Sequence, residues 1–332
     1  VPISGGQVEC DGDRSYRWHA GMVIADPAWK PIQETDKLHP VSRHSIQLWS
    51  RLLLPRSQRW VEIPCGRVFP EDGGNSEDAE APPLEFDITA VSALGTIRAY
   101  LQPVDLSGMR GHTAIETILA AVAPAHPRDL TPTMHCLPPE YVVGEPHGGD
   151  PVADMHAIAA SIGMVLYEDA VGVIRLDPVP DATPDYDWST GVVQRIDVED
   201  TSRSELVNSL LVRSGSHDVD PPVFAVAQIT DPDDPLNVGH GFYYPAPPLV
   251  SDSVTTTGQC QLVADTELVR RRELRQDLSV VIPPHTHLQP GEVAILDRPA
   301  VGVVGTRRVT GWVMSLDTTA LQAVLMRGAV NG

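Results

Sequence analysis

Cysteine is scarce in this chain of 332 residues. The four thiols are widely spaced and include no Cys-x-x-Cys pair, the spacing that zinc knuckles and redox motifs use. They are Cys10, Cys65, Cys136 and Cys260. We therefore expect isolated, small apolar thiols and no metal or redox site built on cysteine.

Long apolar runs are also lacking. The longest, Ala157 to Leu166, is about half of the roughly 20 residues that a membrane-spanning helix needs. Residues 1–6 have neither the cationic start nor the apolar stretch of a secretory signal. We expect no membrane insertion and no such signal in the sequence as given.

Basic side chains are few as well. The chain has 24 Lys and Arg against 44 Asp and Glu, a formal net charge of −20. This balance argues against a nucleic-acid reader, because affinity for phosphate backbones needs clustered cations. Hydrophobic residues make up 42% of the chain and charged residues 20%, which is ordinary globular usage. The 31 prolines and 26 glycines predict many short strands and few helices.

The first third of the chain alternates between apolar and polar residues, the period of a half-buried strand. This pattern predicts strands in Arg14 to Asp26, Ile46 to Leu54 and Leu84 to Ala90. Between the last two, the acidic and proline-closed segment Glu71 to Pro83 predicts an exposed loop. Several strands at such spacing indicate a small barrel or sandwich.

The period changes to that of helices in the middle of the chain. Thr113 and Glu116 fit a capping box at the start of a helix, whose apolar stripe ends before Pro124. Its members are Ile115, Ile118, Leu119 and Val122. A second helix is predicted at Pro151 to Ser161 with Asp150 as N-cap. A hairpin at 165–176 follows it, and residues 127–149 are expected to be a loop.

The second half begins with an acidic, Pro-rich connector at Asp177 to Trp188, which we interpret as a domain boundary. We expect a long excursion at 218–248 and a helix at 259–275, and strands at 206–213, 278–282, 292–296, 307–316 and 321–326. The fold class is α+β and β-dominated, with two small β-barrel-like domains and a helical insertion. The expected domains are 1–108, a two-helix plus hairpin insertion at 109–177, and 178–332.

Metal and catalytic motifs are weak. His285 and His287 form an HxH pair, but the spacing supplies no third ligand, and the same holds for His240 and for His147 near Asp150. The carboxylates of Asp231, Asp233 and Asp234 lie in a proline-broken run without the order of an EF-hand, which favours a solvated acidic loop over a calcium site. No nucleophile elbow, zinc-protease motif or phosphate loop is present. We expect no catalytic residue, no cofactor and no metal.

Two clusters have an alternative reading as binding sites. The run Arg270, Arg271, Arg272 and Arg275 is either a phosphate site or, as we favour, a solvated helix face or an inter-subunit salt-bridge stripe. The exposed-looking aromatics are either a carbohydrate platform or core and interface anchors. They are Trp49, Trp60, Phe242, Tyr243 and Tyr244.

The order of several blocks resembles the minor tail proteins of long-tailed actinobacterial phages and, in the second half, hub-type tail proteins. The blocks in the first half are GGQVECDGDRSYRWHAGMVIADP (5–27), LWSRLLLPRSQRWVEIPCGRVF (48–69) and EFDITAVSALGTIRA (85–99). Those in the second are VNSLLVRSG (207–215), AVAQITDPDDPLN (225–237) and the segment 260–296 that ends in HLQPGEVAIL. The resemblance covers most of the chain, and no single block is a chemical signature.

This resemblance implies a structural virion protein, a baseplate or tail-tip hub assembled in the host cytoplasm. Such a hub is a ring, usually a trimer, that closes the tail tube and anchors distal components. The partners implied are the distal tail protein, the tape-measure protein and fibre or spike proteins. Genome DNA passes without specific binding, which an acidic wall would favour by repulsion. The alternatives are a tail-associated cell-wall hydrolase using the Asp-rich loop and a carbohydrate-binding receptor module.

Overall fold

The computed structural model covers the whole chain, and the placement of most residues is described. The described residues are 3–14, 16–41, 44–54, 58–74, 86–100, 104–123, 133–134, 141–144, 149–181, 183–200, 206–215, 219, 221–273, 276–316 and 321–330. Within these ranges, no helix combines the length and apolar character that crossing a bilayer requires.

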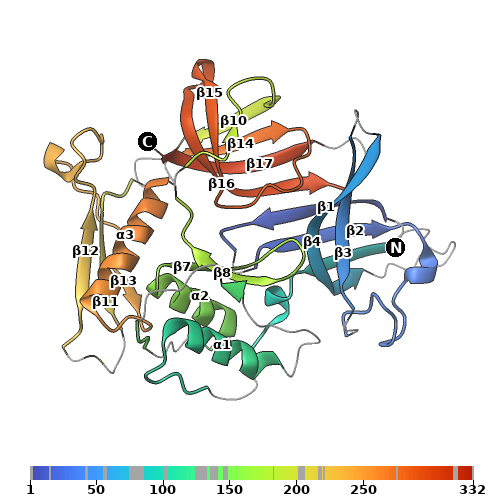
Figure 1. The fold of residues 1–332 in the computed structure, drawn as a ribbon, viewed down its shortest axis with the longest axis horizontal. Coiled ribbons are helices and arrows are strands. Elements are labelled where there is room, and N and C mark those ends of the chain that lie inside the picture. Colours follow the sequence, from blue (N-terminus) through green and yellow to red (C-terminus); the bar gives the residue numbers. More distant parts are fainter. Residues whose placement is uncertain are drawn as a thin grey trace.

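The largest sheet joins strands from both ends of the chain (Figure 1). Its main path runs β10-β14-β17-β16-β1-β2-β5-β4-β3, and β15 and β9 extend it beside β16. The strands are β1 (Ile3–Asp11), β2 (Trp18–Ile24), β3 (Ile46–Leu54), β4 (Arg59–Gly74), β5 (Phe86–Val91), β9 (Tyr186–Asp187), β10 (Arg195–Asp200), β14 (Gln276–Ile282), β15 (Val293–Arg298), β16 (Val303–Ser315) and β17 (Gln322–Val330). The central pairing is antiparallel between β1 and β16, with Gln7 opposite Ser315.

The core of this sheet contains two indole rings from opposite ends of the chain. Trp18 and Trp312 are fully buried and meet edge to face, with ring centroids 5.6 Å apart. Each ring nitrogen donates to a backbone carbonyl, Trp18 Nε1 to Glu168 O at 2.9 Å and Trp312 Nε1 to Leu288 O at 2.8 Å. The predicted alternation in β2 is confirmed, because every second residue from Trp18 to Ile24 is buried. One hydrophobic cluster therefore includes residues from both the first 90 and the last 145 positions.

A second cluster surrounds two helices below the large sheet (Figure 1). It contains α1 (Gly111–Val122), α2 (Pro151–Ser161) and a small sheet in the order β6-β8-β7, made of β6 (Thr133–Met134), β7 (Met164–Glu168) and β8 (Ile174–Pro178). The predicted second helix, the apolar stripe of the first helix and the hairpin are confirmed. Asp150 caps α2 as expected, because its carboxylate accepts from the backbone of Val152 at 2.9 Å and of Ala153 at 3.3 Å.

The predicted capping box at the first helix is wrong. The helix starts at Gly111, two residues before Thr113, and no side chain caps it. Tertiary contacts set this start, since Gly111 N donates to Tyr141 O at 3.2 Å and a Cβ at Gly111 would lie 2.6 Å from the side chain of Ile162. Only glycine permits that approach.

A third cluster lies at one end of the molecule, where α3 (Thr257–Glu273) covers one face of the sheet β12-β11-β13 (Figure 1). The strands are β11 (Ser209–Ser214), β12 (Phe224–Gln228) and β13 (Leu249–Ser251). The described residues include the short 3-10 helices Pro27–Trp29, Leu94–Thr96, Val238–His240 and Pro299–Val301.

Three predicted loops contain regular structure. In the loop predicted at 127–149, Thr133 and Met134 form β6, which pairs in parallel with β8. The excursion 218–248 includes β12, which pairs antiparallel with β11 over five residue pairs. The predicted loop 71–83 begins inside β4, which continues to Gly74, and its remainder lies outside the described residues. Backbone pairing with β5 holds this acidic stretch in the sheet despite its unfavourable composition for a strand. The β-dominated α+β class is confirmed; the boundaries at 108 and 177 stay a prediction.

Candidate interaction surfaces

The β3–β4 hairpin projects beyond the sheet that carries it. β4 pairs with β5 only from Phe69 onward, so the part nearer the turn pairs with β3 alone. β3 is the last strand of the main path, and its outer edge has no partner strand among the described residues. The register places Trp60 opposite Leu53, and this parity brings Trp60 and Trp49 to the same face of the hairpin. Both indoles are more than half exposed, at 63% and 54%.

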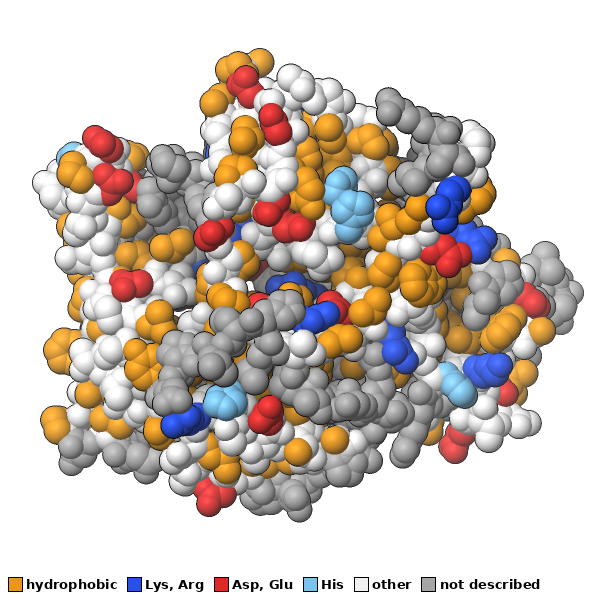
Figure 2. Space-filling view, viewed as in Figure 1, with side chains coloured by type: hydrophobic (Ala, Val, Ile, Leu, Met, Phe, Trp, Pro, Cys, Tyr) orange, Lys and Arg blue, Asp and Glu red, His pale blue; other side chains and the backbone are white. Residues whose placement is uncertain are grey.

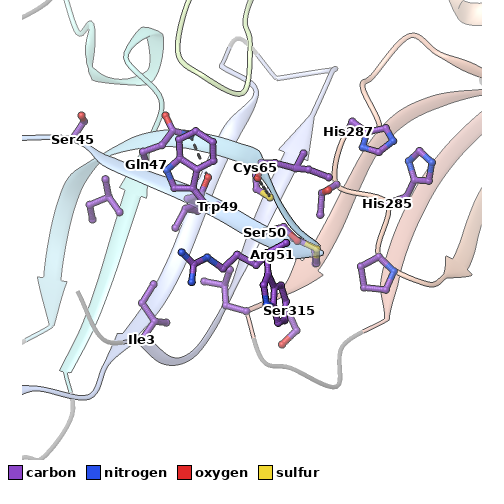
Figure 3. Close-up of a pocket in the computed structure, with 18 of the residues that line it drawn as sticks. Ile3, Ser45, Gln47, Trp49, Ser50, Arg51, Cys65, His285, His287 and Ser315 are labelled. Atoms are coloured by element: carbon purple, nitrogen blue, oxygen red, sulfur yellow. Dashed lines mark hydrogen bonds between the residues drawn. The ribbon is translucent and has the colours of Figure 1, made fainter. Parts of the chain in front are cut away.

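A cleft of about 1300 Å³ lies beside this hairpin. The hairpin forms one wall, and the segment Pro283 to His287 and the end of β16 form the other (Figure 3). Figure 3 shows Trp49 and Arg51 on the hairpin side and the two histidines on the opposite side. We call this feature the cleft.

The charge of the cleft is opposite to that of the chain. Its described lining includes no Asp or Glu, although the chain has 44 of them. Five side chains that carry or can accept a positive charge line it, namely Lys37, His44, Arg51, His285 and His287. Arg51 also contacts Glu62 across the hairpin at 2.6 Å, and both of these side chains are exposed. The cleft therefore combines aromatic surface with two cationic side chains and three histidines.

The HxH pair lies in the wall of the cleft. The rings of His285 and His287 are 4.4 Å apart, and the edge of Tyr186 packs against His285 at 5.0 Å. Burial, with the neighbouring His287 as a smaller cause, lowers the pKa of His285 below its ordinary value. No group of three His, Cys, Asp or Glu in the described ranges could hold a metal ion, and His147 lies outside them.

A second surface lies at the other end of the molecule, on the side of the β12-β11-β13 sheet away from α3. Small side chains face inward there, because Ala225 and Ala227 pack in the core with Cys260 and Ala264 of the helix. Large apolar side chains face outward. The outward positions are Leu211 and Arg213 on β11, Phe224 and Val226 on β12, and Val250 on β13, with Tyr243 at the end where β11 begins. We call these six residues the outer face.

The remaining candidates from the sequence have local structural roles. Asp231 accepts from the backbone of Asp233 at 3.0 Å, and Asp234 accepts from the backbone of Leu236 at 2.8 Å, so these carboxylates organise their own turn. Arg270 and Arg271 each contact Glu267 of the same helix at 2.8 Å, and the inter-subunit stripe stays a prediction. The side chains of Arg272 and Arg275 are outside the described part. His240 is exposed in a 3-10 helix.

The aromatic candidates divide between the two surfaces. Trp49 and Trp60 lie at the cleft, and Tyr243 belongs to the outer face. Phe242 is exposed and stacks on the half-buried Tyr244, with centroids 6.4 Å apart. The sequence indicated the aromatics above, but Phe224 and Val226 were missed. These two residues alternate with alanines, which is the pattern of a strand. In the structure the large residues of this strand point to solvent and the alanines are buried.

No protein-family model matches this chain, and no curated protein matches it by sequence. Solved structures are similar over nearly its full length. The tail protein from Neisseria meningitidis MC58 has a TM-score of 0.66 at 13% identity and covers 98% of this chain and 92% of its own. The 43 kDa tail protein of prophage MuSo2 from Shewanella oneidensis has a TM-score of 0.64 at 10% identity, and the match covers 98% of this chain and 94% of that protein.

A third similar structure is a prophage tail protein from Listeria monocytogenes. It has a TM-score of 0.55 at 11% identity and covers 98% of this chain and 89% of its own. The fold of the chain is therefore that of phage tail proteins. The resemblance deduced from the sequence is confirmed at the level of the fold, and the assignment to actinobacterial phages stays a prediction.

Proposed function

We propose that this chain is a tail-tip hub, a structural virion protein that forms a closed ring of three copies. The ring ends the tail tube, anchors the distal tail protein and fibre or spike proteins, contacts the tape-measure protein, and opens for DNA. The observation that carries this proposal is the shared fold with tail proteins over 98% of the chain.

The surfaces of the chain support assembly as its mechanism. A closed ring needs heterologous contacts, in which one patch on a subunit meets a different patch on its neighbour. The cleft and the outer face are two different patches, and both expose large apolar side chains. Aromatic anchors surrounded by polar residues are typical of protein interfaces.

The net charge of −20 supports the role in DNA passage. Negative groups repel phosphates, so an acidic conduit lets DNA slide without binding. An acidic exterior would produce the same total charge. Neutralising acidic side chains by substitution and measuring genome ejection separates these two placements.

The experiment that tests the proposal is quantitative peptide mass spectrometry on density-purified particles. The copy number of this chain is compared with that of the major tube protein in the same sample. A few copies per particle support the hub. Hundreds of copies would mean a tube or capsid protein, and no copies would mean a free protein such as the hydrolase or receptor module.

Cell-wall turnover provides an independent test against the hydrolase. If the Asp-rich segment were catalytic, substituting Asp231, Asp233 or Asp234 would abolish turnover of purified cell wall. The backbone contacts of Asp231 and Asp234 predict instead that their substitution loosens the local turn.

A further inference from the structure

We propose that the cleft of one copy receives the outer face of the next copy. This inference rests on the proposed ring and names the surfaces that close it. The contact joins the β3–β4 hairpin and Pro283 to His287 of one subunit with the β12-β11-β13 sheet of its neighbour.

The exposed large apolar side chains of the described residues are not evenly spread. Trp49 and Trp60 line the cleft, and five belong to the sheet end, namely Phe224, Val226, Phe242, Tyr243 and Val250. Most of the others occur singly on separate elements. Single exposed apolar residues are ordinary, whereas contiguous groups mark interaction sites.

In β12 the large apolar side chains are exposed and the small ones are buried, the opposite of what an amphipathic strand on a core normally shows. Phe224 and Val226 point to solvent at 63% and 42% exposure, and the alanines between and after them are buried. Burying the larger side chains against α3 would remove more apolar surface from water within one chain. The reversed order is explained if the outer face is buried when the chain assembles.

Charge complementarity selects a second copy of this chain as the occupant of the cleft. The described lining of the cleft has no Asp or Glu, and it has the cations Lys37 and Arg51 beside three histidines. Asp231 and Asp233 follow β12, and Asp252 follows β13, so carboxylates border the outer face at both ends of its sheet. Opposite charges at the border of an apolar contact orient the partners and disfavour wrong pairings.

The one cation in the middle of the outer face also fits this arrangement. Arg213 is opposite Phe224 and Val250 in the sheet and is exposed. The described lining of the cleft offers it no carboxylate, but it offers the exposed faces of Trp49 and Trp60. A guanidinium stacks favourably on an indole ring.

The placement of the two surfaces makes the contact intermolecular. Figure 1 shows the β12-β11-β13 sheet and the β3–β4 hairpin at opposite ends of the molecule. In Figure 2, hydrophobic side chains gather over the hairpin end and also along the edge of the sheet end. One chain cannot bring these ends together, so each copy has one cleft and one outer face to offer, and repetition of the contact produces a ring or an open chain.

The test uses the full chain and two variants that each damage one surface. Trp60→Asp removes an aromatic anchor and adds a charge that repels the acidic border of the outer face. Phe224→Lys adds a charge that repels the cationic cleft. Val304→Asp and Val304→Lys are matched controls, because Val304 is 56% exposed on β16 and belongs to neither surface. All these sites are exposed, so circular dichroism and urea midpoints should match those of the wild type.

Sedimentation velocity then measures association at equal protein concentration. We expect the wild type and both controls to form the same oligomer, and each single variant to associate at least about tenfold more weakly. The decisive sample is an equimolar mixture of the two variants. Trp60→Asp retains an intact outer face and Phe224→Lys retains an intact cleft, so the mixture should form a heterodimer and nothing larger.

Three results would overturn this inference. Single variants that assemble like the wild type would show that other surfaces close the ring. A mixture that stays monomeric would show that the two surfaces do not meet each other. A wild type that remains monomeric up to its solubility limit would show that the contact does not form. In each case the copy number in particles still decides the hub proposal separately.

Discussion

Asn208 allows a direct test of how the segment 229–244 is held in place. The side chain is fully buried and makes three hydrogen bonds to that segment. Its Nδ2 donates to Leu236 O at 3.1 Å and to Phe242 O at 2.8 Å, and its Oδ1 accepts from Tyr244 N at 2.7 Å. One amide therefore ties Leu236, at the end of the turn rich in Asp and Pro, to the backbone of Phe242 and Tyr244.

Asn208→Ala should lower the free energy of unfolding by about 3 kcal/mol. A typical intramolecular hydrogen bond contributes about 1 kcal/mol net, and three are lost. Phe242 is exposed, so water can reach its carbonyl and limit the penalty there. Asn208→Asp should cost at least as much, because it places a carboxylate oxygen against carbonyls that the amide nitrogen now satisfies.

The assay is urea unfolding followed by far-UV circular dichroism, combined with hydrogen exchange. Gln228→Ala on the neighbouring strand is the control, since its side chain is exposed and its loss should change stability by less than about 0.5 kcal/mol. In Asn208→Ala we expect faster exchange at residues 229–246 and unchanged exchange in α1 and α2. A loss below about 1 kcal/mol, or exchange rates equal to those of the wild type, would refute the reasoning.

Four further changes test other parts of the structure. Trp312→Ala should lower the urea-derived stability by about 3–5 kcal/mol, because it empties a buried site and orphans Leu288 O. Asp150→Ala should cost about 1 kcal/mol in the same measurement through loss of the helix cap. Burial raises the pKa of Cys10 to about 12, so iodoacetamide at pH 8 should label it only after urea unfolding, as mass spectrometry would show. The pKa of His285 is lower in the folded protein than in the unfolded chain; protonation therefore favours unfolding, and the wild type should lose more stability than His285→Gln as the pH falls below about 6.5.

The sequence predicted those elements whose signals are local. Alternation located β2, and α2 was placed from Asp150 to Ser161 because a carboxylate cap, a proline at the first position and a glycine after the end all lie within the helix or next to it. The N-cap of α1 was missed by three residues, Thr113 being predicted and Arg110 observed, because contacts with Tyr141 and Ile162 decide where the helix starts. Such contacts leave no trace in the window of residues around Thr113.

The candidate surfaces were only partly predictable. Exposure of Trp49 and Trp60 was expected, but their common face depends on the register of β3 and β4, which shifts by one residue between Leu48 and Trp49. The outer face was missed because the segment around Phe224 has a proline-rich and acidic context that is typical of loops. Pairing with β11 and the buried amide of Asn208 overcome that local preference.

The pairing of β1 with β16 explains why surface function is the hardest feature to deduce from this sequence. Gln7 and Ser315 are more than 300 positions apart and lie opposite each other in the sheet. This pairing joins the two ends of the chain within one sheet, to which the β3–β4 hairpin also belongs. A pattern of residues can indicate that Trp60 or Phe224 is exposed, but the distance and direction between them belong to the complete fold. Since a ring closes only when one surface meets another at a fixed angle, the registers of the large sheet would determine assembly of the proposed ring as much as the exposed side chains do.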